Sequence, residues 1–463
     1  MINHIWYDSE RMSVNEMKYR WVKPSKNEEK PDFKDIVPIR EEKKEGKRFN
    51  TLDDFDPKDK VVIVRVDINT PLDPNKKIMD TTKIKQHAST LDELASKGAK
   101  VVVLSHQGRP GDPDFCSLRQ HAEILQKYVK AKVKFVDDII GPKAIQAIKS
   151  LKPGEILVLE NVRMIPSEME NRSPEEHANG ELVKTLSQFA DAFVLDGFAV
   201  AHRPHASVIG FTAAGLPSYA GRVMEIEVNA LDIAYNCQSR PVDYILGGAK
   251  PKETPELIEH LLSTGKADKI LIGGMIATVF LHCAGYDIGE NNLKEIEEKG
   301  FGQFYGRVKD ILKNYGEKIL LPKDVAIDSD GQRVEISIKD FPPKGLIRDI
   351  GKETVEEFLK ILKTARIIVI NGPVGRFEDK RFSFGTVELI RHLPEKSKAF
   401  IIAGGGHTIA AIEKYNLQEY ISYISSGGGA MLSHLSGEKL PGIEALEKAK
   451  DRRYPTIPLK VKN

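Results

Sequence analysis

The chain has 463 residues, more than one hydrophobic core usually organises, so we expect two domains. Its 69 basic and 67 acidic side chains leave a formal net charge of +2, which excludes a general electrostatic attraction to nucleic acid or an anionic membrane. Three cysteines, Cys116, Cys237 and Cys283, form neither a disulfide framework nor a metal motif, and no segment resembles a membrane span or signal peptide, so we expect a cytoplasmic protein.

Residues 1–47 differ in composition from the rest of the chain. They are rich in charge and contain Pro24, Pro31 and Pro38, so we expect an N-terminal arm with little structure of its own. Its partner cannot be identified from these residues.

Residues 48–218 show short apolar runs that alternate with helical patterns, which predicts a domain with a parallel sheet. The runs are VVIVRVDI, KVVVLSHQ, VKFVDDI, EILVLENV and DAFVLDGF. Between the first two, Ile84, His87, Leu91 and Leu94 recur at the spacing of one helical face, and Gly98 should end that helix.

Residues 219–236 predict a helix that links two domains, because Val223, Ile226, Ala230 and Ala234 recur at helical spacing. A second alternating series over 237–428 predicts another α/β domain, with runs at DYILGGA, KILIGGM, KILLPKDVAI, RIIVINGPVG, AFIIAGGGHT and ISYISSGGGA. Residues 429–463 should pack back on the first domain and end in a tail. The prediction is an α/β protein with two doubly wound parallel-sheet domains joined by a hinge helix.

The predicted strands of the second domain nearly all end in glycine, proline or asparagine. Ligands of open parallel sheets bind beyond the carboxyl ends of the strands, where tight turns let backbone amides approach an anion. Neither a Walker motif nor a G-x-G-x-x-G fingerprint occurs, so ordinary P-loop and dinucleotide folds are not expected. The GGGHT segment at 404–408 could bind a phosphate at a helix start, and it fits a plain strand-to-helix turn equally well.

Arginines recur just beyond the strand ends of the first domain. The segments RVDINTP, SHQGRP, LENVR and AHRPHAS contain Arg65, Arg109, Arg163 and Arg203. A single loop arginine is usually solvated, but several at the same sheet edge indicate an anion site, because guanidinium groups bind phosphate oxygens in pairs.

These segments, in this order, resemble the phosphoglycerate kinases over about residues 48–448. The others that carry the resemblance are GGAK, GGM, NGPVGRFE, GGGHT and SSGGGAMLSHLSGEKLPG. Histidine in the fourth place of GGGHT, where other branches have aspartate, resembles the archaeal type. The resemblance implies reversible phosphoryl transfer between 1,3-bisphosphoglycerate with ADP and 3-phosphoglycerate with ATP, in glycolysis and gluconeogenesis.

The resemblance also implies a role for individual residues. Those expected to bind 3-phosphoglycerate or its bisphosphate are Asp67, Asn69, Lys83, His106, Arg109, Arg163 and Arg203. Those expected to bind ATP or ADP are Gly248, Lys250, Gly274, Asn371, Glu378, Gly404, Gly405, Gly406, His407 and Thr408. Lys83, Lys250 and Arg203 would act on the phosphoryl group in transit.

Three positions depart from the family pattern. Lys83 stands where an arginine is expected, so we expect a weaker contact with the transition state. His407 replaces the aspartate that meets Mg²⁺ in relatives outside the archaea, so we expect the ion to be held mainly by the nucleotide and water, and no protein metal ligand is predicted. Thr254 stands near the place of a second lysine, and Lys252 is the candidate substitute for it.

Two alternatives to an active kinase remain at this stage. A scaffold of the same shape, with reduced catalysis and an arm that binds a partner, is favoured by Lys83 and by residues 1–47, whereas the retained anion-binding groups favour the enzyme. Nucleic-acid binding is suggested only by the basic KDRRYP stretch near the C-terminus, and the balanced total charge opposes it.

Overall fold

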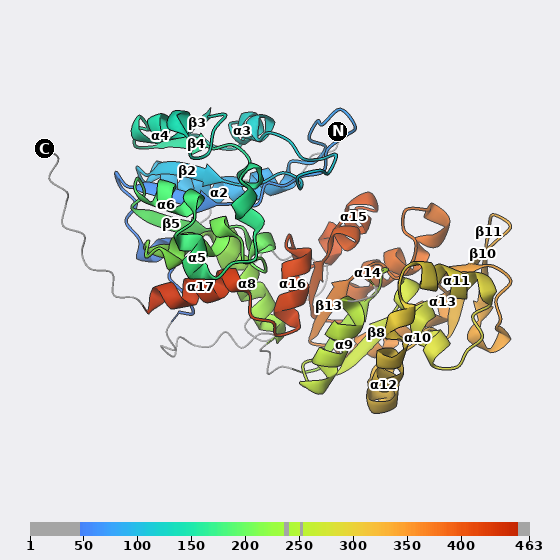
Figure 1. Ribbon diagram of the computed structural model, residues 1–463. Helices are drawn as coiled ribbons and strands as arrows, with labels where there is room; N and C mark the ends of the chain where they lie inside the picture. The colour runs from blue at the N-terminus through green and yellow to red at the C-terminus, as the bar shows by residue number, and fades with distance from the viewer. Residues whose placement is uncertain (1–46, 236–239, 251–252, 452–463) are drawn as a thin grey trace, which may run out of the picture. The chain divides into compact units, whose positions relative to one another are not determined.

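The computed structural model describes residues 47–235, 240–250 and 253–451 (Figure 1). The expected arm up to residue 46, Cys237, Lys252 and the chain beyond 451, with most of KDRRYP, lie outside the described residues. The described chain forms two compact units. We call the residues up to Leu231 and from Ser426 onward the N-terminal unit, and Asp232–Ser425 the C-terminal unit.

The described part of the N-terminal unit contains a parallel sheet in the order β3-β4-β2-β1-β5-β6. The strands are β1 (Val61–Arg65), β2 (Lys100–Leu104), β3 (Lys132–Phe135), β4 (Glu155–Val158), β5 (Ala192–Leu195) and β6 (Ser218–Ala220). The helices are α2 (Thr82–Ser96), α3 (Arg119–Leu125), α4 (Pro142–Lys149), α5 (Pro174–Ala178), α6 (Glu181–Ser187), α7 (Phe211–Ala213), α8 (Arg222–Tyr235, which continues past Leu231), α16 (Gly428–Leu435) and α17 (Pro441–Lys450). Short helical turns are η1 (Leu52–Asp54), η2 (Val162–Met164), η3 (Pro166–Met169), η4 (Phe198–Val200) and η5 (Ala206–Gly210).

Both faces of this sheet are buried, as a doubly wound fold requires. Val62 and Val64 pack into one cluster with side chains of α2 and α3, whereas Ile63 between them is buried on the opposite face. On β5, Phe193 stacks on Phe211 with ring centroids 5.2 Å apart, and Val194 belongs to the first cluster. The short apolar runs are therefore strands covered by helices on both sides, as predicted.

The helix predicted after β1 is α2, and its predicted apolar face is the buried one. It ends at Ser96, and Gly98 follows with a φ of +84°, the left-handed conformation that favours glycine after a helix. Of the residues that predicted α8, Ala230 and Ala234 are each 2% exposed, whereas Ile226 is 42% exposed and lies off the buried face. Met224, Val228 and Leu231 complete the buried stripe.

The segment after Ser426 belongs to the N-terminal unit. Helix α17, red in Figure 1, contacts β6, η5 and α7, and α16 contacts η4. No helix among the described residues is long and apolar enough to cross a membrane.

The described C-terminal unit contains a second parallel sheet, in the order β15-β14-β13-β7-β8-β9. Its strands are β7 (Val242–Leu246), β8 (Lys269–Ile272), β9 (Ile319–Leu320), β13 (Ile367–Asn371), β14 (Phe400–Gly404) and β15 (Tyr423–Ser425). The helices are α9 (Glu253–Ser263), α10 (Gly274–Cys283), α11 (Glu290–Glu298), α12 (Tyr305–Tyr315), α13 (Lys352–Leu362), α14 (Phe384–Lys396) and α15 (Gly406–Lys414). Short helical turns are η6 (Gly302–Phe304), η7 (Gly316–Lys318), η8 (Ile338–Asp340), η9 (Lys380–Phe382) and η10 (Gln418–Tyr420). Ile368 and Ile370 pack among side chains of α13 and α14, whereas Val369 is buried on the other face.

The run KILLPKDVAI is not one strand. Ile319 and Leu320 form β9 at the edge of the parallel sheet, and Asp324–Ser329 forms β10 in a separate antiparallel sheet with β11 (Gln332–Ser337) and β12 (Leu346–Ile350). Pro322 lies between them and has no amide hydrogen for a sheet ladder, which explains the break. The fold class is confirmed, with this antiparallel sheet as an addition that the sequence did not indicate.

The strand order of the second sheet reverses between the parallel neighbours β7 and β13, because β8 and β9 lie on one side of β7 and β13, β14 and β15 on the other. The loops after β7 and β13 touch backbone to backbone. A Cβ atom on Gly372, whose φ is +84°, would lie 2.3 Å from the carbonyl oxygen of Gly247. A Cβ on Gly247 would lie 2.2 Å from the carbonyl oxygen of Pro373. Only glycine fits these positions, at the place in an open parallel sheet where ligands usually bind.

We therefore expect Gly372→Ala to lower the free energy of unfolding by at least about 2 kcal/mol. The alanine would have to adopt a left-handed backbone conformation, and its Cβ would overlap the neighbouring loop. Calorimetric unfolding should show a lower transition temperature. Gly306→Ala in α12 is the matched control, because no atom lies within 4 Å of its added Cβ, and it should leave the transition unchanged or raise it. Equal effects of the two variants would contradict this account of the loops.

Candidate active site

In the N-terminal unit, the predicted substrate residues lie at the carboxyl ends of the central strands and on the adjacent helix. Asp67 and Asn69 follow β1, His106 and Arg109 follow β2, Arg163 follows β4, and Arg203 follows β5. Because parallel strands end at one edge, these loops meet, and Lys83 in α2 joins them through an ion pair with Asp67.

Asp67 is a charged anchor beneath this edge. It is 3% exposed, and its Oδ2 atom lies 2.6 Å from Lys83 Nζ. Burial alone would raise the pKa of Asp67, but the Lys83 ammonium outweighs it and holds that pKa well below the usual range. The loop is fixed further by Gly108 N–H, which donates to Asn69 Oδ1 at 3.0 Å. Asp67 is therefore ionised, and it holds the Lys83 ammonium at the edge of the sheet.

Arg163 is buried with too few partners. It is 3% exposed, and its Nη1 atom donates to the carbonyl oxygen of Gly108. Its Nε and Nη2 atoms are buried and have no hydrogen-bond partner among the described residues. Burial, with the charges of Arg203, Arg65 and Arg109, lowers the pKa of Arg163 to about 10. A buried cation with unbonded donors lowers the stability of the fold unless an anion supplies the missing hydrogen-bond acceptors.

The surrounding side chains add to this excess of positive charge. Arg203 is half-buried, and its pKa is lowered by burial and by Arg109, which is itself exposed. The pKa of His202 is lowered to about 4 by burial and Arg203, and that of His205 to about 3 by burial and Arg65. Both imidazoles are therefore neutral at pH 7. The structure brings together all seven predicted substrate residues. Arg109 is exposed to solvent, as a single loop arginine usually is, whereas Arg163 is not.

Sequence reasoning noted Arg65 but gave it no role. This arginine ends β1, is fully buried, and donates to Ser207 Oγ at 2.7 Å, to the Val66 carbonyl oxygen and to His106 Nδ1 at 3.3 Å. Its position inside an apolar run, where a charged residue is unusual, was the available sign. No sequence feature pointed to Glu168 and Ser207, which support Arg65 in the core.

In the C-terminal unit, the predicted nucleotide residues form a second group at the strand ends. Asn371 Nδ2 donates to the carbonyl oxygen of Gly404 at 3.0 Å, and Gly372 N–H donates to Thr408 Oγ1 at 2.7 Å. A Cβ on Gly405, with a φ of +93°, would lie 2.9 Å from Asn371 Nδ2. The turns after β13 and β14 are therefore locked together.

Helix α15 begins directly after this turn, with Gly405 at its N-cap and no side chain capping its first amides. A Cβ on Gly406 would meet nothing within 4 Å. The open amides and the positive end of the helix dipole fit a phosphate group. His407 is 77% exposed at its side chain, and its Nδ1 atom lies 3.8 Å from Oε1 of Glu378.

Gly248 and Gly274 lie at the neighbouring strand ends. Gly248 N–H donates to the Pro373 carbonyl oxygen at 2.9 Å, and Gly274 N–H donates to that of Val374 at 2.7 Å. Lys250 is exposed two residues after Gly248, with no hydrogen bond or ion pair to another described residue. Lys250 is thus the predicted nucleotide residue that the structure does not join to the others.

Among the described residues, no group of three or more histidine, cysteine, aspartate or glutamate side chains could hold a metal ion. Thr254, at the expected place of a second lysine, is buried in α9.

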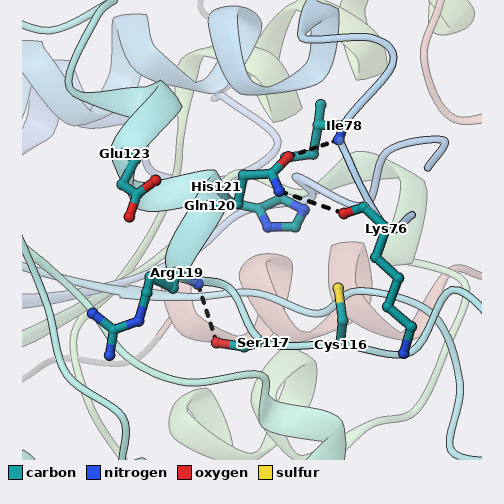
Figure 2. Close-up of a pocket in the computed structure, with 8 residues that line it drawn as sticks. All are labelled: Lys76, Ile78, Cys116, Ser117, Arg119, Gln120, His121 and Glu123. Atoms are coloured by element: carbon teal, nitrogen blue, oxygen red, sulfur yellow. Dashed lines mark hydrogen bonds between the residues drawn. The ribbon is translucent and has the colours of Figure 1, made fainter. Parts of the chain in front are cut away.

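A separate shallow pocket of about 330 Å³ in the N-terminal unit contains none of the predicted site residues. Figure 2 shows Gln120 at this pocket, where it accepts from Ile78 N–H at 2.7 Å and donates to the Lys76 carbonyl oxygen at 3.4 Å. These bonds fix the loop after β1 to α3, so we assign the pocket no chemistry.

A cluster of cations on one parallel sheet and phosphate-sized glycine turns on another indicate an α/β phosphotransferase. The model of the phosphoglycerate kinase family matches residues 52–438, and the chain belongs to this family. The phosphoglycerate kinase of Methanobacterium bryantii is 44% identical over 403 residues, covering 87% of this chain and 98% of that protein. That of Saccharolobus solfataricus is 41% identical and covers 86% and 96%. These archaeal relatives confirm the resemblance to the archaeal type.

Solved structures agree with this assignment. The crystal structure of phosphoglycerate kinase from Pyrococcus horikoshii OT3 matches with a TM-score of 0.81 at 39% identity, covering 86% of this chain and 99% of that one. The enzyme from Coxiella burnetii matches with a TM-score of 0.73 at 32% identity, covering 87% and 100%.

The incomplete bonding of Arg163 predicts that Arg163→Met will not destabilise the ligand-free protein, because it removes a buried charge without a full set of partners. Added 3-phosphoglycerate should raise the unfolding temperature of the variant much less than that of the wild type. A ligand stabilises the folded protein in proportion to how tightly it binds, and the variant lacks the Arg163 contacts. Differential scanning calorimetry with and without the ligand measures both effects.

Arg222→Met is the control for this comparison. Arg222 is also largely buried, but it pairs with Asp53, Glu93 and Glu225, so its loss should cost about 3 kcal/mol. A ligand-free Arg163→Met protein that is destabilised as much as Arg222→Met would contradict the interpretation of Arg163 as an anion-binding group.

Proposed function

We propose that this protein catalyses the reversible transfer of a phosphoryl group between 1,3-bisphosphoglycerate and ADP, giving 3-phosphoglycerate and ATP. The observation that carries the proposal is the pair of buried, unbonded nitrogens on Arg163 within a cluster of like charges. A phosphate oxygen supplies the acceptors and the negative charge that this group lacks.

On the substrate side, Arg109, Arg163 and Arg203 bind the distal phosphate together with His106. Asp67 and Asn69 contact the glycerate hydroxyl and carboxylate region. Lys83 lies against Asp67 and has donors left for the phosphoryl group, because an ammonium has three hydrogens and one is used at 2.6 Å. These assignments combine the family resemblance with the cluster geometry.

On the nucleotide side, the open amides of Gly405 and Gly406, with His407 and Thr408, receive the nucleotide phosphates at the start of α15. Asn371 and Gly404 form the rigid base of this turn, Glu378 accepts from the ribose, and Gly248 and Gly274 line the neighbouring strand ends. Mg²⁺, when bound with the nucleotide, neutralises charge on the phosphates. We infer that nucleotide oxygens and water hold it, since the exposed His407 is a poor ligand for a hard cation.

The chemistry asks the protein for positioning and positive charge rather than for a nucleophile. The carboxylate of 3-phosphoglycerate and the terminal oxygen of ADP are the attacking groups in the two directions. Lys83, Lys250 and Arg203 place positive charge on the equatorial oxygens of the transferring group. Lys250 has no competing partner among the described residues, which leaves its ammonium available.

Three features remain predictions from the sequence. They are the domain limits at 47, 218, 236 and 428, the hinge role of residues 219–236, and the cytoplasmic location. A role in glycolysis and gluconeogenesis follows from the reaction itself. The small molecules 3-phosphoglycerate and 1,3-bisphosphoglycerate are the proposed partners, and the arm up to residue 46 has no assigned partner.

A coupled assay with MgATP and 3-phosphoglycerate tests the proposal. We expect saturable turnover with the full chain and with a chain that starts at Lys47. No turnover from either chain, with the folded state verified by calorimetry, would favour the scaffold alternative. Binding of the arm to another protein would leave the enzymatic result unchanged.

We expect Lys83→Arg to raise kcat by roughly threefold or more, because a guanidinium can keep the ion pair with Asp67 and still offer donors to the phosphoryl group. Steady-state kinetics in the direction of 1,3-bisphosphoglycerate formation measure the change. Lys127→Arg, at an exposed position, is the control and should leave kcat unaltered. An unchanged or lower kcat for Lys83→Arg would remove Lys83 from the phosphoryl-contacting set.

A further inference from the structure

A continuous chain of buried hydrogen bonds runs from Glu168 to His106. Glu168 in η3 and Ser207 in η5 are both fully buried, and Ser207 donates to the Glu168 carboxylate twice, from its backbone N–H at 2.8 Å and from Oγ at 2.6 Å. Arg65 Nε donates to Ser207 Oγ at 2.7 Å, and Arg65 Nη2 lies 3.3 Å from His106 Nδ1. Four segments distant in sequence thus meet in one line.

The direction of each bond follows from the chemistry of the groups. A guanidinium has only donors, so Ser207 Oγ and His106 Nδ1 both act as acceptors toward Arg65. The Ser207 hydroxyl proton is then free to point at Glu168. An imidazole that accepts at Nδ1 carries its proton at Nε2 when it is neutral. The bonding pattern therefore selects one tautomer of His106.

We propose that Glu168 and Ser207 are positioning residues that hold Arg65 against His106 and thereby fix His106 as a neutral Nε2–H donor to the substrate phosphate. The substrate part of this inference rests on the proposed function. The contacts of His106 with Arg65 and Asp67 both run through Nδ1, and the Asp67 distance of 3.9 Å is too long for a hydrogen bond. The Nε2 side is left for a ligand.

The electrostatic surroundings explain why Arg65 needs this support. Arg65 is fully buried, and the acidic groups that favour its charge are Glu168 and Asp67, whereas Arg203 opposes it. Without Ser207 and Glu168, repulsion from the neighbouring arginines would move the guanidinium. Burial and then Arg65 hold the pKa of His106 well below its usual value, with Arg163 and Lys83 acting in the same direction and Asp67 against them.

Ser207→Ala in the full chain is the direct test. We expect KM for 3-phosphoglycerate to rise about tenfold, the effect of misplacing one hydrogen bond to a charged group, while KM for MgATP stays the same. Ser218→Ala is the matched control: Ser218 is also buried in the N-terminal unit, and its Oγ bonds are to Thr212 and Leu216. The control should keep both KM values. Glu168→Gln, which keeps the shape and removes the charge, should shift KM in the same direction as Ser207→Ala.

NMR of protein with ¹⁵N-labelled histidine rings gives a readout that a merely structural role would not move, with His106 assigned from its loss in His106→Gln. In the wild type we expect a proton on Nε2, none on Nδ1, and no titration near neutral pH, because burial and then Arg65 hold the pKa of His106 well below its ordinary value. In Ser207→Ala, where Arg65 no longer donates to Nδ1, the ring should lose its single Nε2–H tautomer and carry its proton on either nitrogen.

The outcomes separate the two claims. A proton on Nδ1 of wild-type His106, or a Ser207→Ala protein with the KM and ring tautomer of the control, would overturn the positioning chain. A wild type with the expected ring protonation but no turnover of 3-phosphoglycerate would support the chain and reject the proposed function.

Discussion

Positive charge buried without enough negative charge to balance it is the constraint on which the N-terminal unit depends. Burial and Arg203 lower the pKa of Arg65 and of Arg163, and burial and Arg109 lower that of Arg203. Burial and the same positive charges keep the His205 imidazole neutral. A fold optimised only for stability would not keep such a group, because desolvated cations are expensive and mutual repulsion adds to the cost. The arrangement makes sense when an anion of the right size completes it.

The two acidic groups in this region serve different purposes. Asp67 lies at the sheet edge, accepts from Lys83 and is firmly ionised. Glu168 lies deeper, where burial raises its pKa even though Arg65 and Arg163 oppose that shift. One carboxylate thus orients a cation at the edge, and the other supports a cation in the core. Neither carboxylate bonds to Nε or Nη2 of Arg163, which stay available to a ligand.

The anion site that we propose in the C-terminal unit depends on backbone geometry rather than on charged side chains. Its strand-end turns approach so closely that Gly247 and Gly372 cannot carry a Cβ, and Thr408 fixes Gly372 N–H from the start of α15. Amides held this rigidly can face a phosphate without rearrangement, which is the condition for electrostatic preorganisation.

The sequence predicted the parallel sheets and helix α2, because apolar runs and helical spacing are local features, and the family resemblance supplied the two sets of site residues that we propose. It missed what depends on distant contacts. The split of KILLPKDVAI between two sheets depends on the pairing of β10 with β11 and β12, and the chain from Glu168 to Ser207 and Arg65 joins residues 39 and 142 positions apart. Buried polar side chains look like any other core position until the fold brings their partners together.

A crystal structure with 3-phosphoglycerate bound would test the central claim most directly: phosphate oxygens should lie within hydrogen-bonding distance of Nε and Nη2 of Arg163. A bound ligand that leaves both nitrogens without partners would contradict it.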